Sequence, residues 1–101
     1  MQYDPTDTDE QDRQADEKAA GSRVAADNED ADFKWLMGSR RGRRIVWGAI
    51  ERAGVFRSSF NTNSMAMAFN EGRKNEGLRV LAKINALCPD LYAVMAKEAT
   101  E

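Results

Sequence analysis

The chain has 101 residues, enough for a single domain, and its net charge of −2 conceals two parts of opposite sign. Residues 1–32 hold eleven acidic and three basic side chains, a net of −8, whereas residues 33–101 hold six acidic and twelve basic ones, a net of +6. The chain has no histidine and one cysteine, Cys88, which excludes an intramolecular disulfide and the usual zinc ligand sets, so we expect no cofactor. No apolar run approaches the length of about 18 residues that suggests a membrane span, so no membrane partner is expected and the protein should stay in a cytoplasm.

Residues 1–29 form an acidic tail with almost nothing to bury, because Met1, Tyr3 and Val24 are its only sizeable apolar residues. Ordering a residue costs about 1–2 kcal/mol, which the tail cannot offset by apolar burial. This composition predicts a disordered tail, with nascent helix near residues 13–20. The folded unit then spans residues 30–101, and a core of that size supplies only about 3–5 kcal/mol of net stability. Homo-oligomerisation is the remaining source of support.

The rest of the chain has helical periodicity and no alternating strand pattern, which predicts an all-α fold, a small bundle of three to four helices. Ser39 is placed to cap one helix and Gly54 to end it in the left-handed conformation, while Asn63 or Ser64 caps the next. The predicted helices span residues 30–37, 40–53, 64–87 and 90–99.

Apolar spacing predicts which helix faces are buried. In the second helix Ile45, Ala49 and Ala53 form one stripe, with Val46 and Ile50 beside it. Inward positions of the later helices are Met65, Phe69, Leu78, Val80, Leu81, Ile84 and Leu87, then Leu91, Val94 and Met95.

Two glycines lie inside the long helix, where each costs about 1 kcal/mol relative to alanine. We interpret Gly72 and Gly77 as sites where another helix approaches closely, with a kink as the alternative.

An arginine cluster, Arg40, Arg41, Arg43 and Arg44, opens the second predicted helix. It admits three interpretations: a solvated face, a phosphate site assisted by backbone N–H groups, or a docking surface for carboxylates of a partner or of the tail. Cations at the positive end of the helix dipole are unfavourable unless anions lie nearby, which argues against a merely solvated face. An isoelectric point near 5.2 is low for a dedicated DNA-binding protein, so nucleic acid is the less favoured partner.

The sequence lacks the usual combination of a nucleophile and a general base, because without histidine neither Cys88 nor any serine has a recognisable base. We therefore expect no enzymatic activity. Trp35 and Trp47 are interpreted as core anchors, one of which could instead be a hot spot at a partner surface. On the long helix, Glu71 can pair with Lys74, and Glu76 with Arg79.

Several strings resemble a family of small proteins of tailed bacteriophages and prophages, first named from a short-tailed Bordetella phage. Those strings are residues 32–37, Gly42 to Trp47, Phe60, Phe69 to Leu78, and then Pro89, Tyr92, Met95 and Glu98. Lys74 stands where the family pattern favours arginine, which keeps the charge but loses the bidentate fork. The resemblance covers residues 30–100 and implies a phage gene lying among those for portal, scaffold and capsid proteins.

Together these observations predict a non-enzymatic phage protein, found in the virion or the host cytoplasm, that binds a portal, scaffold or capsid protein during virion assembly or in the head-to-tail region. The alternatives are a DNA-contacting packaging or ejection factor and an acidic-tailed inhibitor of a host protein. The residues predicted to bind the partner are Arg40, Arg41, Arg43, Arg44, Trp35, Trp47, Glu71, Arg73 and Lys74.

Overall fold

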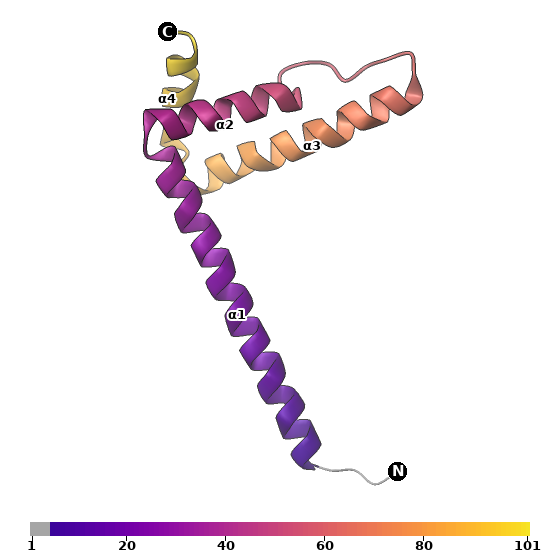
Figure 1. The fold of residues 1–101 in the computed structure, drawn as a ribbon, viewed down its shortest axis with the longest axis vertical. Helices are drawn as coiled ribbons and strands as arrows, with labels where there is room; N and C mark the ends of the chain where they lie inside the picture. The colour runs from indigo at the N-terminus through magenta and orange to yellow at the C-terminus, as the bar shows by residue number, and fades with distance from the viewer. Residues whose placement is uncertain (1–4) are drawn as a thin grey trace. The chain divides into compact units, whose positions relative to one another are not determined.

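The computed structural model describes residues 5–101, with side chains from residue 8 onward (Figure 1). Over these residues the chain forms four helices and no strand, which confirms the predicted all-α fold. The chain divides after Asp32 into two compact units, and the first helix runs across that boundary. None of the described helices is long and apolar enough to cross a membrane. The helices are α1 (Pro5–Met37), α2 (Arg40–Ala53), α3 (Ser64–Leu87) and α4 (Asp90–Ala99).

Residues 5–32 of the N-terminal unit are helical where the sequence predicted a disordered tail with nascent helix near residues 13–20, and residues 1–4 of that predicted tail lie outside the described residues. Its side chains are almost all exposed from residue 8 to residue 32, so local terms and not core burial favour the helix. Residues 5–32 include six alanines, three glutamates, two glutamines and two arginines, which are good helix formers, alongside seven aspartates, which are not. Arg13 pairs with Glu10 and Glu17 one turn away on either side, and the hydrogen bond from Arg13 lowers the pKa of Glu10.

In the C-terminal unit, α2 and α3 run antiparallel and side by side, and α4 packs where α2 begins and α3 ends (Figure 1). Ser39 caps α2, since its Oγ accepts from the backbone N–H of Gly42 at 3.0 Å. Gly54 ends α2 with φ of 80°, in the left-handed region that glycine tolerates best. Asn63 caps α3 through hydrogen bonds from the N–H groups of Met65 and Ala66.

A small apolar core holds this unit together. Partly buried side chains, among them Trp47, Val55 and Cys88, pack around it. Several predicted inward positions are instead exposed, so those predictions were wrong. The exposed residues are Ala49, Ile45 (62%), Met65 (82%), Phe69 (69%), Leu78 (41%) and Val94 (40%). The fully or nearly buried core residues are Met37, Val46, Ile50, Ile84 and Met95.

Gly42 explains why α2 is rotated away from the predicted stripe centred on Ile45. A Cβ at Gly42 would lie 1.6 Å from the carbonyl oxygen of Leu36, so the end of α1 passes directly over this position. With Gly42 facing inward, Val46 and Ile50 follow it at helical spacing into the core, and Ile45 turns outward. The close approach of two backbone segments therefore sets the buried face of α2.

The two glycines of α3 have different surroundings. Gly77 is buried, and a Cβ there would lie 2.6 Å from the Cβ of Ala53 and 2.5 Å from Val55, which supports the predicted close approach of α2. Gly72 has no atom within 4 Å of the position of such a Cβ. Close packing therefore accounts for Gly77 and not for Gly72.

Candidate functional site

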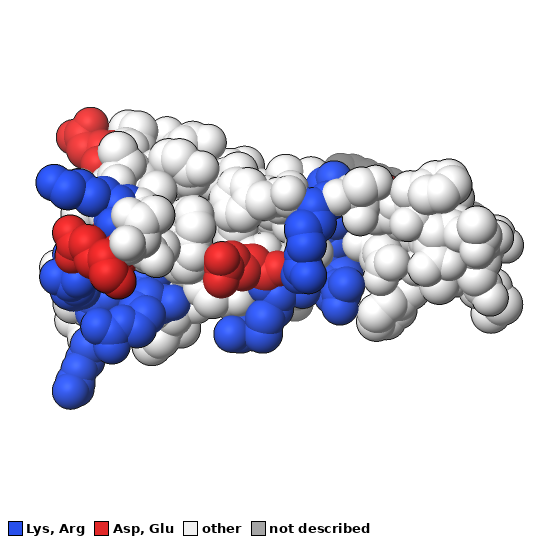
Figure 2. Space-filling view, turned by 90° about the horizontal axis from the view of Figure 1, so that it is seen from above, with Lys and Arg blue, Asp and Glu red and all other residues white. Residues whose placement is uncertain are grey.

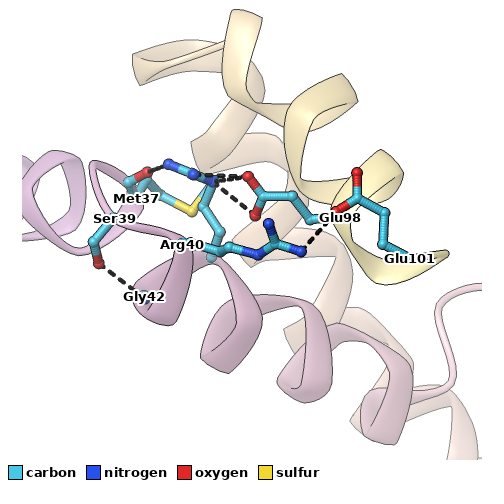
Figure 3. A network of polar contacts seen from close by, with 7 residues as sticks. Met37, Ser39, Arg40, Gly42, Glu98 and Glu101 are labelled. Carbon is cyan, nitrogen blue, oxygen red and sulfur yellow. Dashed lines mark hydrogen bonds and ion pairs between the residues drawn. The ribbon is translucent and has the colours of Figure 1, made fainter.

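Arg43 is held inside the C-terminal unit by the carboxylate of Glu98 and the backbone carbonyl of Met37. Both of these partners are labelled in Figure 3. The guanidinium of Arg43 donates through Nη2 and Nε to Glu98 at 2.7 and 3.1 Å, and through Nη1 to the carbonyl oxygen of Met37 at 3.0 Å. Only 13% of the Arg43 side chain and 17% of the Glu98 side chain are exposed. The hydrogen bond from Arg43 lowers the pKa of Glu98, and the same bond raises the pKa of Arg43.

This bidentate pair ties three segments of the fold together, because Met37 ends α1, Arg43 lies in the first turns of α2 and Glu98 lies in α4. The sequence predicted that Arg43 would face a binding partner. The structure instead gives Arg43 a structural position, so it is not available at the surface as Arg41 and Arg44 are.

Carboxylates in α4 and just after its end supply the anions that the arginine cluster needs. Arg40 pairs with Glu101 at 2.6 Å, in a solvent-exposed contact (Figure 3). Glu98 and Glu101 therefore place negative charge beside the positive N-terminal end of α2. Arg41 and Arg44 are exposed and make no hydrogen bond or ion pair with any described residue, so their donors remain open to a ligand.

A cleft of about 330 Å³ lies between the first half of α2 and the end of α4. Its apolar part comes from Trp47 and Met95, and its rim carries both arginines and glutamates. Figure 2 shows acidic and basic side chains mixed at the end of the molecule where α2 begins and α4 ends. We call it the α2–α4 cleft; its lining residues are Arg40, Arg44, Trp47, Glu51, Met95, Glu98, Ala99 and Glu101.

The two tryptophans have different environments. Trp47 is half-buried, stacks against Phe56 with ring centroids 5.3 Å apart, and lines the cleft. Trp35 is 80% exposed and does not line the cleft, so the interpretation of Trp35 as a core anchor was wrong. Sequence spacing alone did not distinguish Trp35, which faces solvent, from Trp47, which packs against Phe56.

The remaining predicted residues lie on α3, outside the cleft. Arg73 lies over the ring of Phe69 at 5.7 Å and donates to Asn70. Lys74 donates to the carbonyl oxygen of Arg57 at 3.2 Å, in place of the predicted pair with Glu71.

The second predicted pair on α3 is present. Arg79 and Glu76 form an exposed ion pair at 2.8 Å, one helical turn apart.

Sequence reasoning missed the acidic half of the cleft. Glu98 and Glu101 lie more than fifty positions from the arginines they contact, and local spacing carries no signal for such a pairing. Glu51 and Met95 were likewise unassigned as cleft residues, because only the packing of α4 on α2 brings them together. The sequence contains one indication that anions lie nearby, namely that four arginines occupy the positive end of a helix dipole, where cations are unfavourable.

Comparisons with known proteins place the chain in a family. No curated protein and no solved structure shows significant similarity to it. The family model described as Bbp19-like phage protein matches residues 33–97, which includes α2, α3 and nearly all of α4. Because this match covers well over half of the sequence and almost the entire C-terminal unit, the chain belongs to the Bbp19-like phage protein family.

Proposed function

We propose that this phage protein acts without catalysis, by binding another phage protein during virion assembly or in the head-to-tail region through the α2–α4 cleft. The observation that carries the proposal is the composition of the cleft, in which Arg40 and Arg44 lie beside Trp47 and Met95. Arginine, methionine and the aromatic residues are the types enriched at protein interfaces, where an apolar centre is surrounded by a polar rim.

The charges of the cleft favour a protein partner over nucleic acid. Glu51, Glu98 and Glu101 line the same space as the two arginines, and two of these carboxylates already pair with arginines of α2. A phosphate backbone would be repelled by them, whereas a protein surface with both charges and an apolar side chain can match the pattern. The expected partner is a portal, scaffold or capsid protein that presents an acidic residue next to an apolar one.

The arginines that the fold leaves without an internal ion pair favour one alternative, a DNA-contacting packaging or ejection factor. Arg41 and Arg44 are exposed near the N-terminal end of α2, where backbone dipoles also attract anions. In this case the same side chains contact phosphates, and binding falls steeply as salt concentration rises.

Cosedimentation of the purified protein with capsids and with portal assemblies of the encoding phage tests the proposal. Replacing Arg40 and Arg44 with glutamine should abolish binding while the helices remain, since glutamine is a good helix former and the exposed pair with Glu101 contributes little. The matched control replaces Arg52 and Arg73, which removes the same charge outside the cleft.

The parent and the control variant are expected to bind the particles equally. Equal binding by the cleft variant would contradict the proposal. Tight binding of duplex DNA by the parent at about 150 mM salt, lost in the cleft variant, would replace it with the DNA-contacting function.

A further inference from the structure

The first half of α3 carries an apolar face that nothing in the C-terminal unit covers. Met65 is 82% exposed and Phe69 is 69% exposed, and Ala68 and Gly72 between and beyond them are exposed as well. Positions i, i+3, i+4 and i+7 share one side of a helix, so these four residues form a continuous stripe. We call Met65, Ala68, Phe69 and Gly72 the α3 stripe.

No contact within the C-terminal unit requires a glycine at position 72. Glycine in a helix interior lowers the stability of the helix. At position 77 of the same helix, close contact with Ala53 and Val55 leaves no room for a larger residue. At Gly72, in contrast, a Cβ would meet open space. A glycine that leaves the outer backbone of a helix bare is suited to close approach by a second molecule, and it lies in line with two large exposed apolar side chains.

Three of the four stripe residues, Met65, Ala68 and Phe69, lie in a segment without charge, and Gly72 follows between Glu71 and Arg73. No Lys, Arg, Asp or Glu occurs in residues 58–70, between Arg57 and Glu71. In Figure 2 the end of the molecule where the loop meets α3 is correspondingly free of charged side chains, unlike the opposite end. A second copy presents the same uncharged segment, whereas a charged partner would find only Glu71 and Arg73, at one end of the stripe, to pair with.

We propose that the α3 stripe binds the same stripe of a second copy of this chain, with the two α3 helices antiparallel across a two-fold axis. Along the helix the stripe alternates large and small residues, Met65, Ala68, Phe69 and Gly72. In the antiparallel register centred between Ala68 and Phe69, Met65 of one copy packs on Gly72 of the other, and each Phe69 packs on the other Ala68. A two-fold interface requires such self-complementarity, and this stripe provides it.

Two further exposed side chains enlarge the apolar surface beside the stripe. Phe60 in the preceding loop is 76% exposed and Met67 is 37% exposed, and both add apolar surface within the uncharged segment. An interface built on these side chains lies at the lower end of the range for specific complexes, about 1,200 Å² in total. We therefore expect a dimer that exchanges with monomer at micromolar concentrations. The dimer gives the small core of the C-terminal unit the support that its size predicts it needs.

Sedimentation velocity of the full chain, up to about 200 µM, tests the proposal. The parent should shift from monomer to dimer with concentration, and Phe69→Glu should raise the dissociation constant by at least about tenfold. Trp35→Glu is the matched control, because it puts the same charge at an equally exposed aromatic residue outside the stripe and should leave the dimer unchanged.

Gly72→Leu distinguishes specific packing from a merely adhesive surface. Leucine is a better helix former than glycine and its Cβ would have no neighbour within 4 Å, so the monomer should keep its fold by circular dichroism. On our proposal the added side chain blocks Met65 of the other copy and weakens the dimer. Stronger association of Gly72→Leu would overturn the proposal, and so would a parent that stays monomeric or a Phe69→Glu variant that dimerises normally.

The antiparallel register has a separate test by cysteine cross-linking, with Cys88 replaced by serine. A mixture of Met65→Cys and Gly72→Cys chains should form the mixed disulfide faster than either variant forms its own. Faster formation of the Met65→Cys homodimer would show parallel helices and overturn the proposed arrangement.

Discussion

Replacing Gly42 with alanine tests how the C-terminal unit is built. The new Cβ would lie 1.6 Å from the carbonyl oxygen and 2.7 Å from the carbonyl carbon of Leu36, whereas ordinary contacts lie at 3.4–4 Å. The obstacle is backbone at the end of α1, which cannot rotate away as a flexible side chain can. The substitution must therefore separate α1 from α2 or shift α2 along its axis, and either movement disturbs Val46 and the bond from Arg43 to Met37.

The expected cost follows from two opposing effects. Overpacking a buried site costs about 1–3 kcal/mol, and a clash with backbone belongs at the upper end of that range. The higher helix propensity of alanine raises the free energy of unfolding by up to about 1 kcal/mol. The net loss is about 2 kcal/mol, a large part of the roughly 3–5 kcal/mol expected for a unit of this size.

Urea unfolding followed by tryptophan fluorescence measures this loss, and Gly72→Ala is the matched control. The same substitution on α3 meets open space, so it should raise the free energy of unfolding by about 1 kcal/mol, measured at dilute protein concentration. Opposite signs for the two variants are expected. If Gly42→Ala were as stable as the parent, the close passage of α1 over α2 would be refuted.

Three further predictions concern the tryptophans, the buried ion pair and the thiol. Trp47→Ala should lower the free energy of unfolding by about 2 kcal/mol, roughly half the cost of removing a fully buried tryptophan. Trp35→Ala should change the free energy of unfolding by less than about 0.5 kcal/mol, because Trp35 is exposed. Equal effects of the two substitutions in urea melts would contradict their different burial. Because the pKa of Glu98 is lowered in the folded state, its pairing with Arg43 stabilises the fold at pH values above the ordinary pKa of 4.5. This stabilisation is lost as the pH falls through the lower pKa of the folded state. Glu98→Gln should therefore flatten the acid side of the plot of unfolding free energy against pH more than the exposed Glu76→Gln does. Burial raises the pKa of the Cys88 thiol, so its reaction with a disulfide reagent at pH 8 should be slower than that of a free thiol and should accelerate in urea.

The boundaries of α2 and the start of α3 were predictable because capping residues mark them locally, whereas the start of α1, predicted at residue 30, lies at Pro5. Ser39, Gly54 and Asn63 act through hydrogen bonds or backbone angles within a few residues, and the structure places all three as predicted. The rotation of α2 was not predictable from apolar spacing, because Ile45 and Val46 are equally apolar and only the contact between Gly42 and Leu36 decides which one faces inward.

The candidate site was predictable only in its basic half. The arginine cluster is contiguous in sequence, so its position at the start of α2 followed from the cap. Its pairing with Glu98 and Glu101 depends on α4 folding back across α2, a tertiary arrangement that no local pattern encodes. The helix in the N-terminal unit was underestimated for a related reason, since an expectation based on core burial gives too little weight to helix propensity and to pairs such as Arg13 with Glu17.

Quantitative mass spectrometry of purified virions and assembly intermediates tests the central claim most directly. Phage carrying the parent gene, the variant with Arg40 and Arg44 replaced by glutamine, and the variant with Arg52 and Arg73 replaced by glutamine are compared at equal intracellular levels of the protein. We expect the protein in particles of the parent and of the second variant, at equal copy number, and its loss from particles of the first. Equal incorporation of all three forms, or absence of the parent protein from every particle and intermediate, would contradict a role of the α2–α4 cleft in virion assembly.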